Sequence, residues 1–299
     1  MKYEAVRTYS QEFSVRKMCR VLALAENAYY QWLRREELRK EKRCIEQQII
    51  KYLRVIFEEN RQVYGYRRMY QIICRIQQTE ELLPSFMTEP ISEYKVRYLM
   101  QQNGMFPLSL VKHKPYKKSL GDGRFLENLV NGDFNPDKPN EVWAGDITYI
   151  KTVLGWVYLA VVVDLFNREI VGYAISKSAD AELVKRALGN ALAHSGKGAK
   201  ILFHSDRRTQ YSSRSYQKML ADNHLTGSMS NVSCPQDNAC VESFFSTAKK
   251  ECIYRKEYVT MDEVQHDLFA YIELFYNRKR MHGSLGYLSP VEYRLAHAA

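Results

Sequence analysis

The chain has 299 residues, enough for about two domains, and its 45% hydrophobic and 26% charged residues are an ordinary balance for a globular protein. No apolar run approaches the roughly 18 residues of a membrane span, and the first residues lack the apolar core of a signal peptide. The cysteines are scattered without a CxxC pair, which argues against a disulfide framework. We therefore expect a cytoplasmic protein that has no membrane contact.

The net charge of +10 is unevenly distributed along the chain. Residues 1–118 hold 23 Lys and Arg against 13 Asp and Glu, and the remainder is balanced. Such asymmetry is typical of a polyanion-binding region joined to a neutral domain. The alternative is a set of helices whose basic faces are simply solvated.

The first 58 residues have the pattern of short helices around a tight turn. Ser14 is placed to cap a helix, whose apolar stripe consists of Val15, Met18, Cys19 and Leu22. A break at residues 23–25 precedes a second helix that begins near Asn27. We predict a helix-turn-helix-like region over 1–58.

A second helical, DNA-binding-like module is predicted over 59–105. One of its helices begins with an aromatic and basic run that places Arg67 and Arg68 where they could contact phosphates, and Ser92 is placed to cap another helix. A dimerisation or packing module is the alternative. Residues 106–140, rich in Pro, Gly, Asn and Lys, are predicted to be a basic linker, with a cluster of lysines between Lys112 and Lys118.

From residue 141 the period changes to that of strands. Three β-rich runs separated by turn residues predict an antiparallel meander, and helices then alternate with two short predicted strands, the first of them apolar. The order β-β-β-α-β-α-β-α is that of an α/β, RNase H-like core, which we place at 141–255, with Asp237 as the cap of its last helix. Residues 256–299 are predicted to be a helical extension that opens with a capping box at Thr260 and Glu263.

Three carboxylates stand at chemically informative positions of this core. Asp146 lies mid-strand among β-forming residues, Asp206 ends a buried strand, and Glu242 lies in the first turns of a helix. Burying an unpaired carboxylate costs several kcal/mol, so some compensation such as a metal is expected at Asp146. Magnesium prefers oxygen ligands and completes its coordination with water and substrate phosphate. We therefore predict that these residues are both catalytic and metal-binding.

The expected cofactor is a pair of Mg²⁺ or Mn²⁺ ions. Two such ions about 4 Å apart can activate an attacking oxygen and stabilise a leaving oxygen in one in-line displacement. Lys249 lies on the same helical face as Glu242 and could hold a DNA phosphate nearby. Near the C-terminus, Arg280 and His282 could contact DNA or could favourably end a helix.

At this point the sequence resembles a known family. The carrying motifs include W-x-x-D-I-T-Y-I, H-S-D-R-x-x-Q-Y, D-N-A-x-x-E-S-F-F and Y-N-x-x-R-x-H, and Y-G-Y-R-R near residue 66 extends the likeness over nearly the whole chain. They resemble bacterial insertion-sequence DDE transposases of the OrfB type, which have a retroviral-integrase-like core. The resemblance implies that Asp146, Asp206 and Glu242 bind the metals and that Lys249 is the matching basic residue.

The resemblance also implies partners and activity. It implies cleavage of element ends, their joining to target DNA, a homo-oligomer on DNA, and an upstream OrfA-type partner or fusion. Two departures stand out: Arg208 and Thr209 occupy positions where the family usually has Gly and Ser, and residues 231–236 replace a segment that is commonly basic and aromatic. We expect the bulk of Arg208 to alter the turn after Asp206.

Two rival functions use the same sequence features. One is a non-cutting DNA-binding regulator derived from a transposase, which the altered segments favour and the intact carboxylates disfavour. The other is a structure-selective nuclease on the same fold, which the basic N-terminal helices and the C-terminal motif disfavour.

Overall fold

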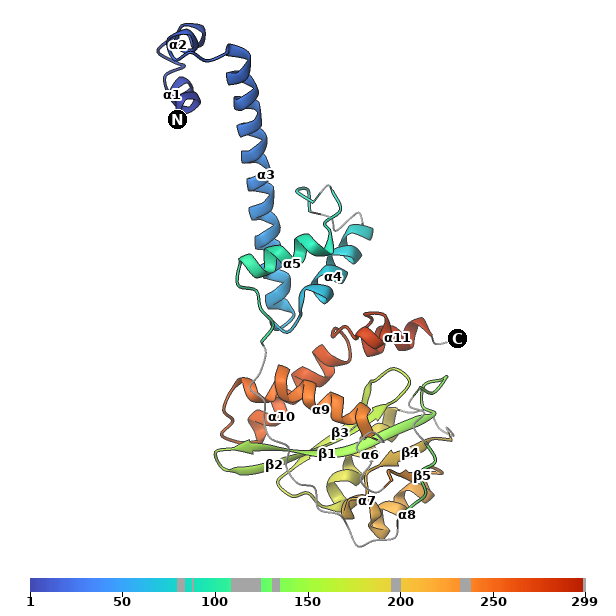
Figure 1. The fold of residues 1–299 in the computed structure, drawn as a ribbon. Helices are drawn as coiled ribbons and strands as arrows, with labels where there is room; N and C mark the ends of the chain where they lie inside the picture. The colour runs from blue at the N-terminus through green and yellow to red at the C-terminus, as the bar shows by residue number, and fades with distance from the viewer. Residues whose placement is uncertain are drawn as a thin grey trace. The chain divides into compact units, whose positions relative to one another are not determined.

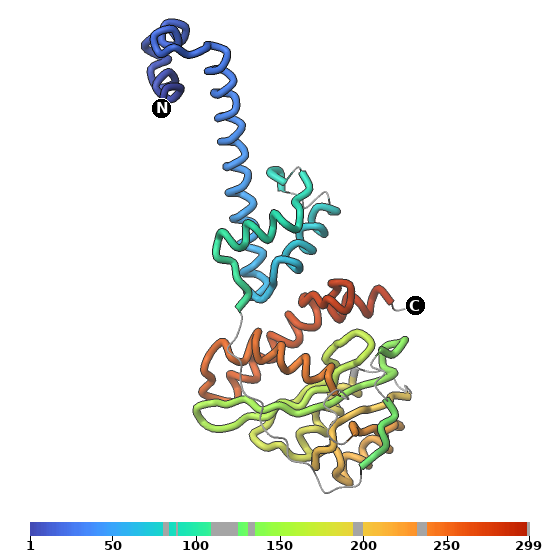
Figure 2. Tube along the Cα trace, viewed as in Figure 1, coloured from blue at the N-terminus to red at the C-terminus, as the bar shows by residue number. Residues whose placement is uncertain are grey.

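The computed structural model describes residues 1–79, 84–87, 89–108, 125–130, 135–194, 200–231 and 238–297. The chain divides into two compact units, Met1–Pro107 and Leu108–Ala299, each described by itself below (Figure 1, Figure 2). The boundary falls at the start of the predicted linker, and the finer five-part division stays a prediction. Within the described ranges no helix is long and apolar enough to cross a membrane.

The first unit begins with α1 (Lys2–Thr8) and α2 (Val15–Val21), which pack against the start of α3 (Glu26–Glu59). Their small core is built around the buried side chains of Val6, Cys19 and Tyr29. The turn between α2 and α3 includes Ala23 with a φ of 53°. Ser14 occupies the N-cap position of α2, although its side chain makes no capping hydrogen bond to that helix.

The long helix α3 contributes buried side chains near its start and near its end. It runs unbroken for 34 residues because the segment contains no Gly or Pro. Its C-terminal half buries Ile49, Leu53 and Ile56, and it contacts α4 (Tyr66–Gln78) and α5 (Glu93–Gln102). The predicted cap of α5 is confirmed, because the Ser92 hydroxyl accepts a hydrogen bond from the Lys95 backbone N–H at 3.2 Å.

The second unit is organised by a five-stranded sheet of order β3-β2-β1-β4-β5. Its strands are β1 (Val142–Thr152), β2 (Gly155–Asp164), β3 (Ile170–Ser176), β4 (Leu202–Ser205) and β5 (Thr226–Met229). The first three strands pair antiparallel, and β4 pairs parallel with both β1 and β5. The predicted meander and the RNase H-like α/β order are confirmed.

Helices cover both faces of the sheet (Figure 1). On one face lie α6 (Ala181–His194), α7 (Thr209–Ser212) and α8 (Arg214–Asp222), whose apolar residues share a core with the strands. Gly172 of β3 permits a close approach of α6, since a Cβ there would lie 2.4 Å from the Ala187 carbonyl oxygen. On the other face α9 (Ala239–Glu251) crosses β1 and β2.

Part of the predicted linker belongs to this sheet. Residues 125–130 run beside the edge strand β5, where the Leu129 backbone N–H donates to the Ser228 hydroxyl at 2.9 Å. The Met229 backbone N–H donates to the Glu127 carbonyl oxygen at 3.3 Å. The lysine cluster of 112–118 and the predicted cap Asp237 lie outside the described residues.

The C-terminal segment is helical, as predicted. It consists of η3 (Ile253–Arg255), α10 (Met261–Phe269), the π-helical η4 (Ala270–Tyr276), η5 (Gly283–Leu285) and α11 (Pro290–Ala296). The Thr260 hydroxyl caps α10, while the Glu263 carboxylate accepts from the Val259 backbone N–H, one residue before the expected partner. A complete capping box is formed instead at α11, between Ser289 and Glu292.

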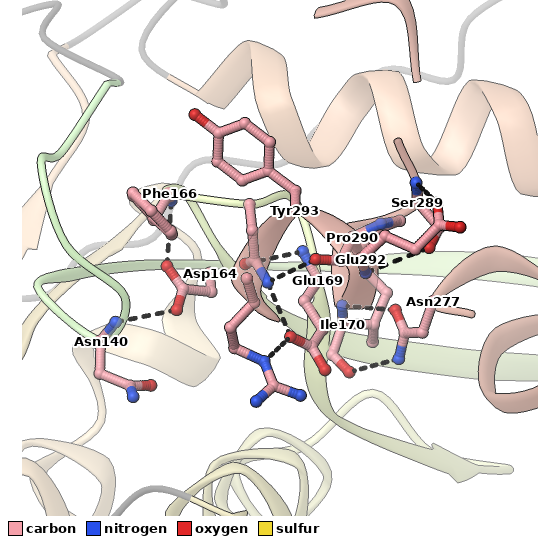
Figure 3. Close-up of polar contacts among 12 residues, drawn as sticks. Asn140, Asp164, Phe166, Glu169, Ile170, Asn277, Ser289, Pro290, Glu292 and Tyr293 are labelled. Atoms are coloured by element: carbon pink, nitrogen blue, oxygen red, sulfur yellow. Dashed lines mark hydrogen bonds and ion pairs between the residues drawn. The ribbon is translucent and has the colours of Figure 1, made fainter. Parts of the chain in front are cut away.

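Buried polar contacts fix this segment to β3 and its preceding turn (Figure 3). The Asn277 side chain accepts from the Ile170 backbone N–H at 2.9 Å and donates to the Ile170 carbonyl oxygen at 3.0 Å. The Asn167 side chain donates to the Pro290 carbonyl oxygen, and Arg294 Nε pairs with Glu169 at 2.9 Å. The Asn277 side chain therefore pairs with the Ile170 backbone N–H and carbonyl oxygen at the start of β3, as the backbone of a neighbouring strand would.

The pair of Asn277 bonds can be tested with Asn277→Asp, which removes the donor and sets a buried carboxylate against the Ile170 carbonyl oxygen. We expect the free energy of unfolding to fall by about 2–4 kcal/mol, measured by urea denaturation. Asn223→Asp, at an exposed helix end, is the control and should cost less than about 1 kcal/mol. Equal losses in both variants would contradict the role of Asn277.

Candidate active site

Asp146 lies in the central strand β1 and is only 2% exposed. The preceding Gly145 is required by close packing on the opposite face, because a Cβ there would lie 2.6 Å from the Phe203 ring and 3.3 Å from the Tyr211 hydroxyl. Asp146 is on the α9 side of the sheet, since successive side chains of a strand alternate between faces. Its own Oδ1 accepts from the Ile147 backbone N–H at 2.7 Å.

The register of the parallel pair β1–β4 brings the two aspartates together. Gly145 lies opposite Ser205, so the residues that follow, Asp146 and Asp206, are neighbours at the end of β4. Glu242 lies in the first turn of α9, the helix that crosses β1. The fold thus directs the three predicted residues, which are far apart in sequence, to one region of the sheet.

A guanidinium group stands between the two aspartates. Arg208 Nε lies 2.9 Å from Asp206 Oδ2, and Arg208 Nη2 lies 3.4 Å from Asp146 Oδ1. Arg208 Nη1 donates to the Ile147 carbonyl oxygen at 2.7 Å, and the Arg208 backbone N–H donates to Asp206 Oδ1 at 3.2 Å. One residue therefore supplies the cationic partner that the buried Asp146 requires.

The electrostatics of Arg208 report on the same cluster. Burial acts to lower the pKa of this guanidinium, but the negative charges of Asp146 and Asp206, with smaller effects of Tyr211 and Glu242, outweigh it and raise the pKa. Glu242 thus acts electrostatically on the same cation as the two aspartates. The site is an acidic cluster whose negative charge Arg208 offsets in part.

The donor set fits a hard divalent cation in chemistry and charge, because it offers only anionic oxygens. Yet among the residues whose positions are described, no three His, Cys, Asp or Glu side chains lie close enough to one another to hold a metal ion. The Arg208 guanidinium lies between the carboxylates of Asp146 and Asp206, where it contacts both.

Lys249 lies two turns after Glu242 on α9, near the charged groups of Asp146 and Arg208. Its Nζ is 4.9 Å from the centroid of the Tyr149 ring. Burial lowers the pKa of Lys249 and repulsion from Arg208 adds to this, while Asp146 opposes it. A half-buried amine at the border of an acidic pocket is suitably placed to meet a phosphate.

Arg280 forms a buried ion pair, and the contact of Arg280 and His282 with DNA stays a prediction. Arg280 is 6% exposed, and its Nε and Nη2 each lie 2.7 Å from a Glu251 carboxylate oxygen. The Tyr271 hydroxyl donates to the same carboxylate at 2.9 Å. His282 is half-buried, with its ring centroid 4.9 Å from that of Tyr276. The geometry of Arg280 is that of a buried ion pair that ties α9 to the C-terminal segment.

Arg67 and Arg68 belong to the first unit, at the start of α4. Arg67 is exposed and lies 3.9 Å from Glu93, and the Arg68 guanidinium is 5.5 Å from the centroid of the Tyr64 ring. Their contact with DNA stays a prediction.

Sequence reasoning did not predict three features of the site. The expectation from the sequence rests only on the bulk of Arg208. The positive charge of this residue, two positions after Asp206, was the signal that could have predicted its ion pairs. Glu251 lies two residues after Lys249, yet nothing in the sequence pairs it with Arg280. Asn238 begins α9, with Nδ2 3.5 Å from the Gly145 carbonyl oxygen and a buried Oδ1 that has no partner among the described residues.

Comparison with known proteins agrees with this fold. Two family models described as integrase core domain match residues 136–235 and 242–297. The chain is 35% identical over 293 residues to transposase InsF for insertion sequence IS3A of Escherichia coli K12, covering 98% of both chains. It is 34% identical to a transposase for insertion sequence element IS904 of Lactococcus lactis, covering 85% of this chain and 97% of the relative.

Among solved structures, the HTLV-2 integrase catalytic core domain in complex with magnesium aligns with a TM-score of 0.38 and 16% identity, covering 52% of this chain and 97% of that one. On the strength of the curated relatives, the chain belongs to the family of insertion-sequence transposases that have an integrase core domain.

The buried ion pair predicts the effect of Arg280→Ala. Removing the cation leaves the Glu251 charge unpaired in the interior, so we expect a loss of about 3–5 kcal/mol in the free energy of unfolding, measured by urea denaturation. The control is Arg278→Ala, an exposed neighbour, which should change stability by less than about 0.5 kcal/mol. A loss of DNA affinity in Arg280→Ala at unchanged stability would instead support a direct DNA contact.

Proposed function

We propose that this protein is a DDE transposase that cleaves the ends of an insertion element and joins them to target DNA. One arrangement carries the proposal: Asp146 of β1 and Asp206 at the end of β4 share ion pairs with Arg208, and Glu242 lies in the first turn of α9, the helix that crosses β1. Such a cluster of carboxylates at the centre of an RNase H-like sheet suits the binding of divalent ions beside a phosphodiester.

The proposed cofactor is a pair of Mg²⁺ or Mn²⁺ ions held by Asp146, Asp206 and Glu242. When bound, such ions stabilise the charge of an attacking and a leaving oxygen. The protein's own contribution is position and charge. The rigid centre of the sheet fixes the two aspartates, and Lys249 orients a DNA phosphate beside them.

The basic first unit is proposed to hold DNA through Arg67 and Arg68. Their guanidinium groups extend from the start of α4, where positive backbone N–H groups add to the attraction for phosphate. We further propose that the protein works as a homo-oligomer on DNA. An OrfA-type partner or fusion would supply recognition of the element ends.

Glu242→Gln tests the catalytic role. Loss of one ligand charge should reduce joining of labelled element-end DNA by at least about 100-fold in Mg²⁺, with DNA affinity retained. The matched control is Glu182→Gln on α6, where the carboxylate is exposed and pairs with Lys185; its joining should equal that of the wild type.

The same assay separates the rival functions. Wild-type protein that binds element ends but never nicks them, alone or fused to its upstream partner, would establish the non-cutting regulator instead. Cleavage of branched DNA without any joining would favour a nuclease. The comparisons offer no support for either rival.

Arg67→Ala in the full chain tests the DNA surface of the first unit. Loss of one phosphate contact should reduce the slope of log affinity against log salt concentration by about 1, measured by fluorescence anisotropy on duplex DNA. Arg39→Ala on α3, an equally charged and exposed change, is the control. An unchanged slope in Arg67→Ala would remove this residue from the interface.

A further inference from the structure

We propose that Arg208 is an internal lock on the catalytic pocket, occupying the cation position between Asp146 and Asp206 until a divalent ion displaces it. This inference rests on the proposed catalytic role of the two aspartates. It assigns to Arg208 a regulatory role, in which metal loading requires the guanidinium to leave.

The lock is built by several simultaneous contacts. The Arg208 side chain reaches Asp206 through Nε and Asp146 through Nη2, and it anchors Nη1 on the Ile147 carbonyl oxygen. Charge-assisted hydrogen bonds of this kind are stronger than neutral ones and fix geometry. Because both aspartates share one planar group, the guanidinium is a direct rival of any ion that would bridge them.

Arg208 can release the pocket only by moving. A guanidinium does not lose its proton in proteins, so the positive charge persists while the side chain stays in place. The side chain is 22% exposed, against 3% for Asp146, which gives it a route to solvent. An incoming divalent ion replaces the single positive charge of the departing guanidinium with two.

Arg207 provides a matched comparison in the adjacent position. It carries the same charge, but its Nε donates to the Ser230 carbonyl oxygen at 2.7 Å and its guanidinium lies 4.9 Å from the centroid of the Phe125 ring. Its loss therefore changes the net charge of the protein as much as the loss of Arg208 does, without opening the pocket between the aspartates.

Metal binding in the absence of DNA tests the lock. Mn²⁺ titrations of the full chain, followed by electron paramagnetic resonance, compare the wild type with Arg208→Ala, Arg208→Lys and Arg207→Ala. We expect Arg208→Ala to bind Mn²⁺ at least about tenfold more tightly than the wild type, because a competing charge next to both ligands is gone. Arg208→Lys should lie between the two, and Arg207→Ala should match the wild type. Adding Asp146→Asn to Arg208→Ala should abolish the gain.

A second measurement observes Arg208 directly in the wild-type protein and uses variants only to assign its resonance and to locate the ion site. The side-chain Nε–H resonance of Arg208, assigned by its absence from the Arg208→Lys spectrum, should shift toward that of a solvent-exposed arginine as Mg²⁺ is added. The Arg207 resonance should remain in place. If the Arg208 resonance stays unchanged while ions fill a site that Asp146→Asn destroys, the lock is wrong.

The outcomes separate this inference from the proposed function. Equal Mn²⁺ affinity in the wild type and Arg208→Ala, at a site that depends on Asp146, overturns the lock and leaves the catalytic proposal intact. The absence of any Mn²⁺ binding that depends on Asp146, in every variant, overturns both.

Discussion

The pairing of β4 beside β1 is the constraint on which the site depends. These strands are parallel with Gly145 opposite Ser205, so Asp146 and the residue that follows β4 must be neighbours. A shift of one residue would turn Asp146 to the other face of the sheet, because side chains alternate along a strand. The close packing of Phe203 and Tyr211 over Gly145 opposes such a shift.

The register also creates an electrostatic problem that the protein solves locally. Two carboxylates, one of them buried, are placed side by side, and carboxylates without a cation would repel each other and resist burial. Arg208, which lies in the same turn as Asp206, reduces the repulsion between the two carboxylates and pairs with the buried one. A second buried carboxylate, that of Glu251 at the far end of α9, forms an ion pair with Arg280. Each end of α9 is thus associated with an arginine–carboxylate cluster.

The sequence predicted the sheet well, because apolar alternation marks strands and the order of elements limits the topology. It did not reveal which polar residues are internal. Asn277 and Arg280 lie in a polar, basic run that is indistinguishable from a surface by pattern, and their partners Ile170 and Glu251 are remote in sequence. The pairing of Arg208 with Asp146 likewise depends on strand register, which local periodicity does not report.

The short segment 125–130 has a consequence for where the catalytic unit begins. An edge strand presents unpaired backbone groups that can recruit other chains, and proteins commonly cover such edges. Here the backbone of Met229 in β5 bonds to Glu127, and the Leu126 side chain packs over Gly227. The matched integrase core region starts only at residue 136. A fragment cut at that point would lose the residues that cover β5 and would expose the backbone groups of this edge strand, so the compact unit, which begins at Leu108, extends upstream of the matched region.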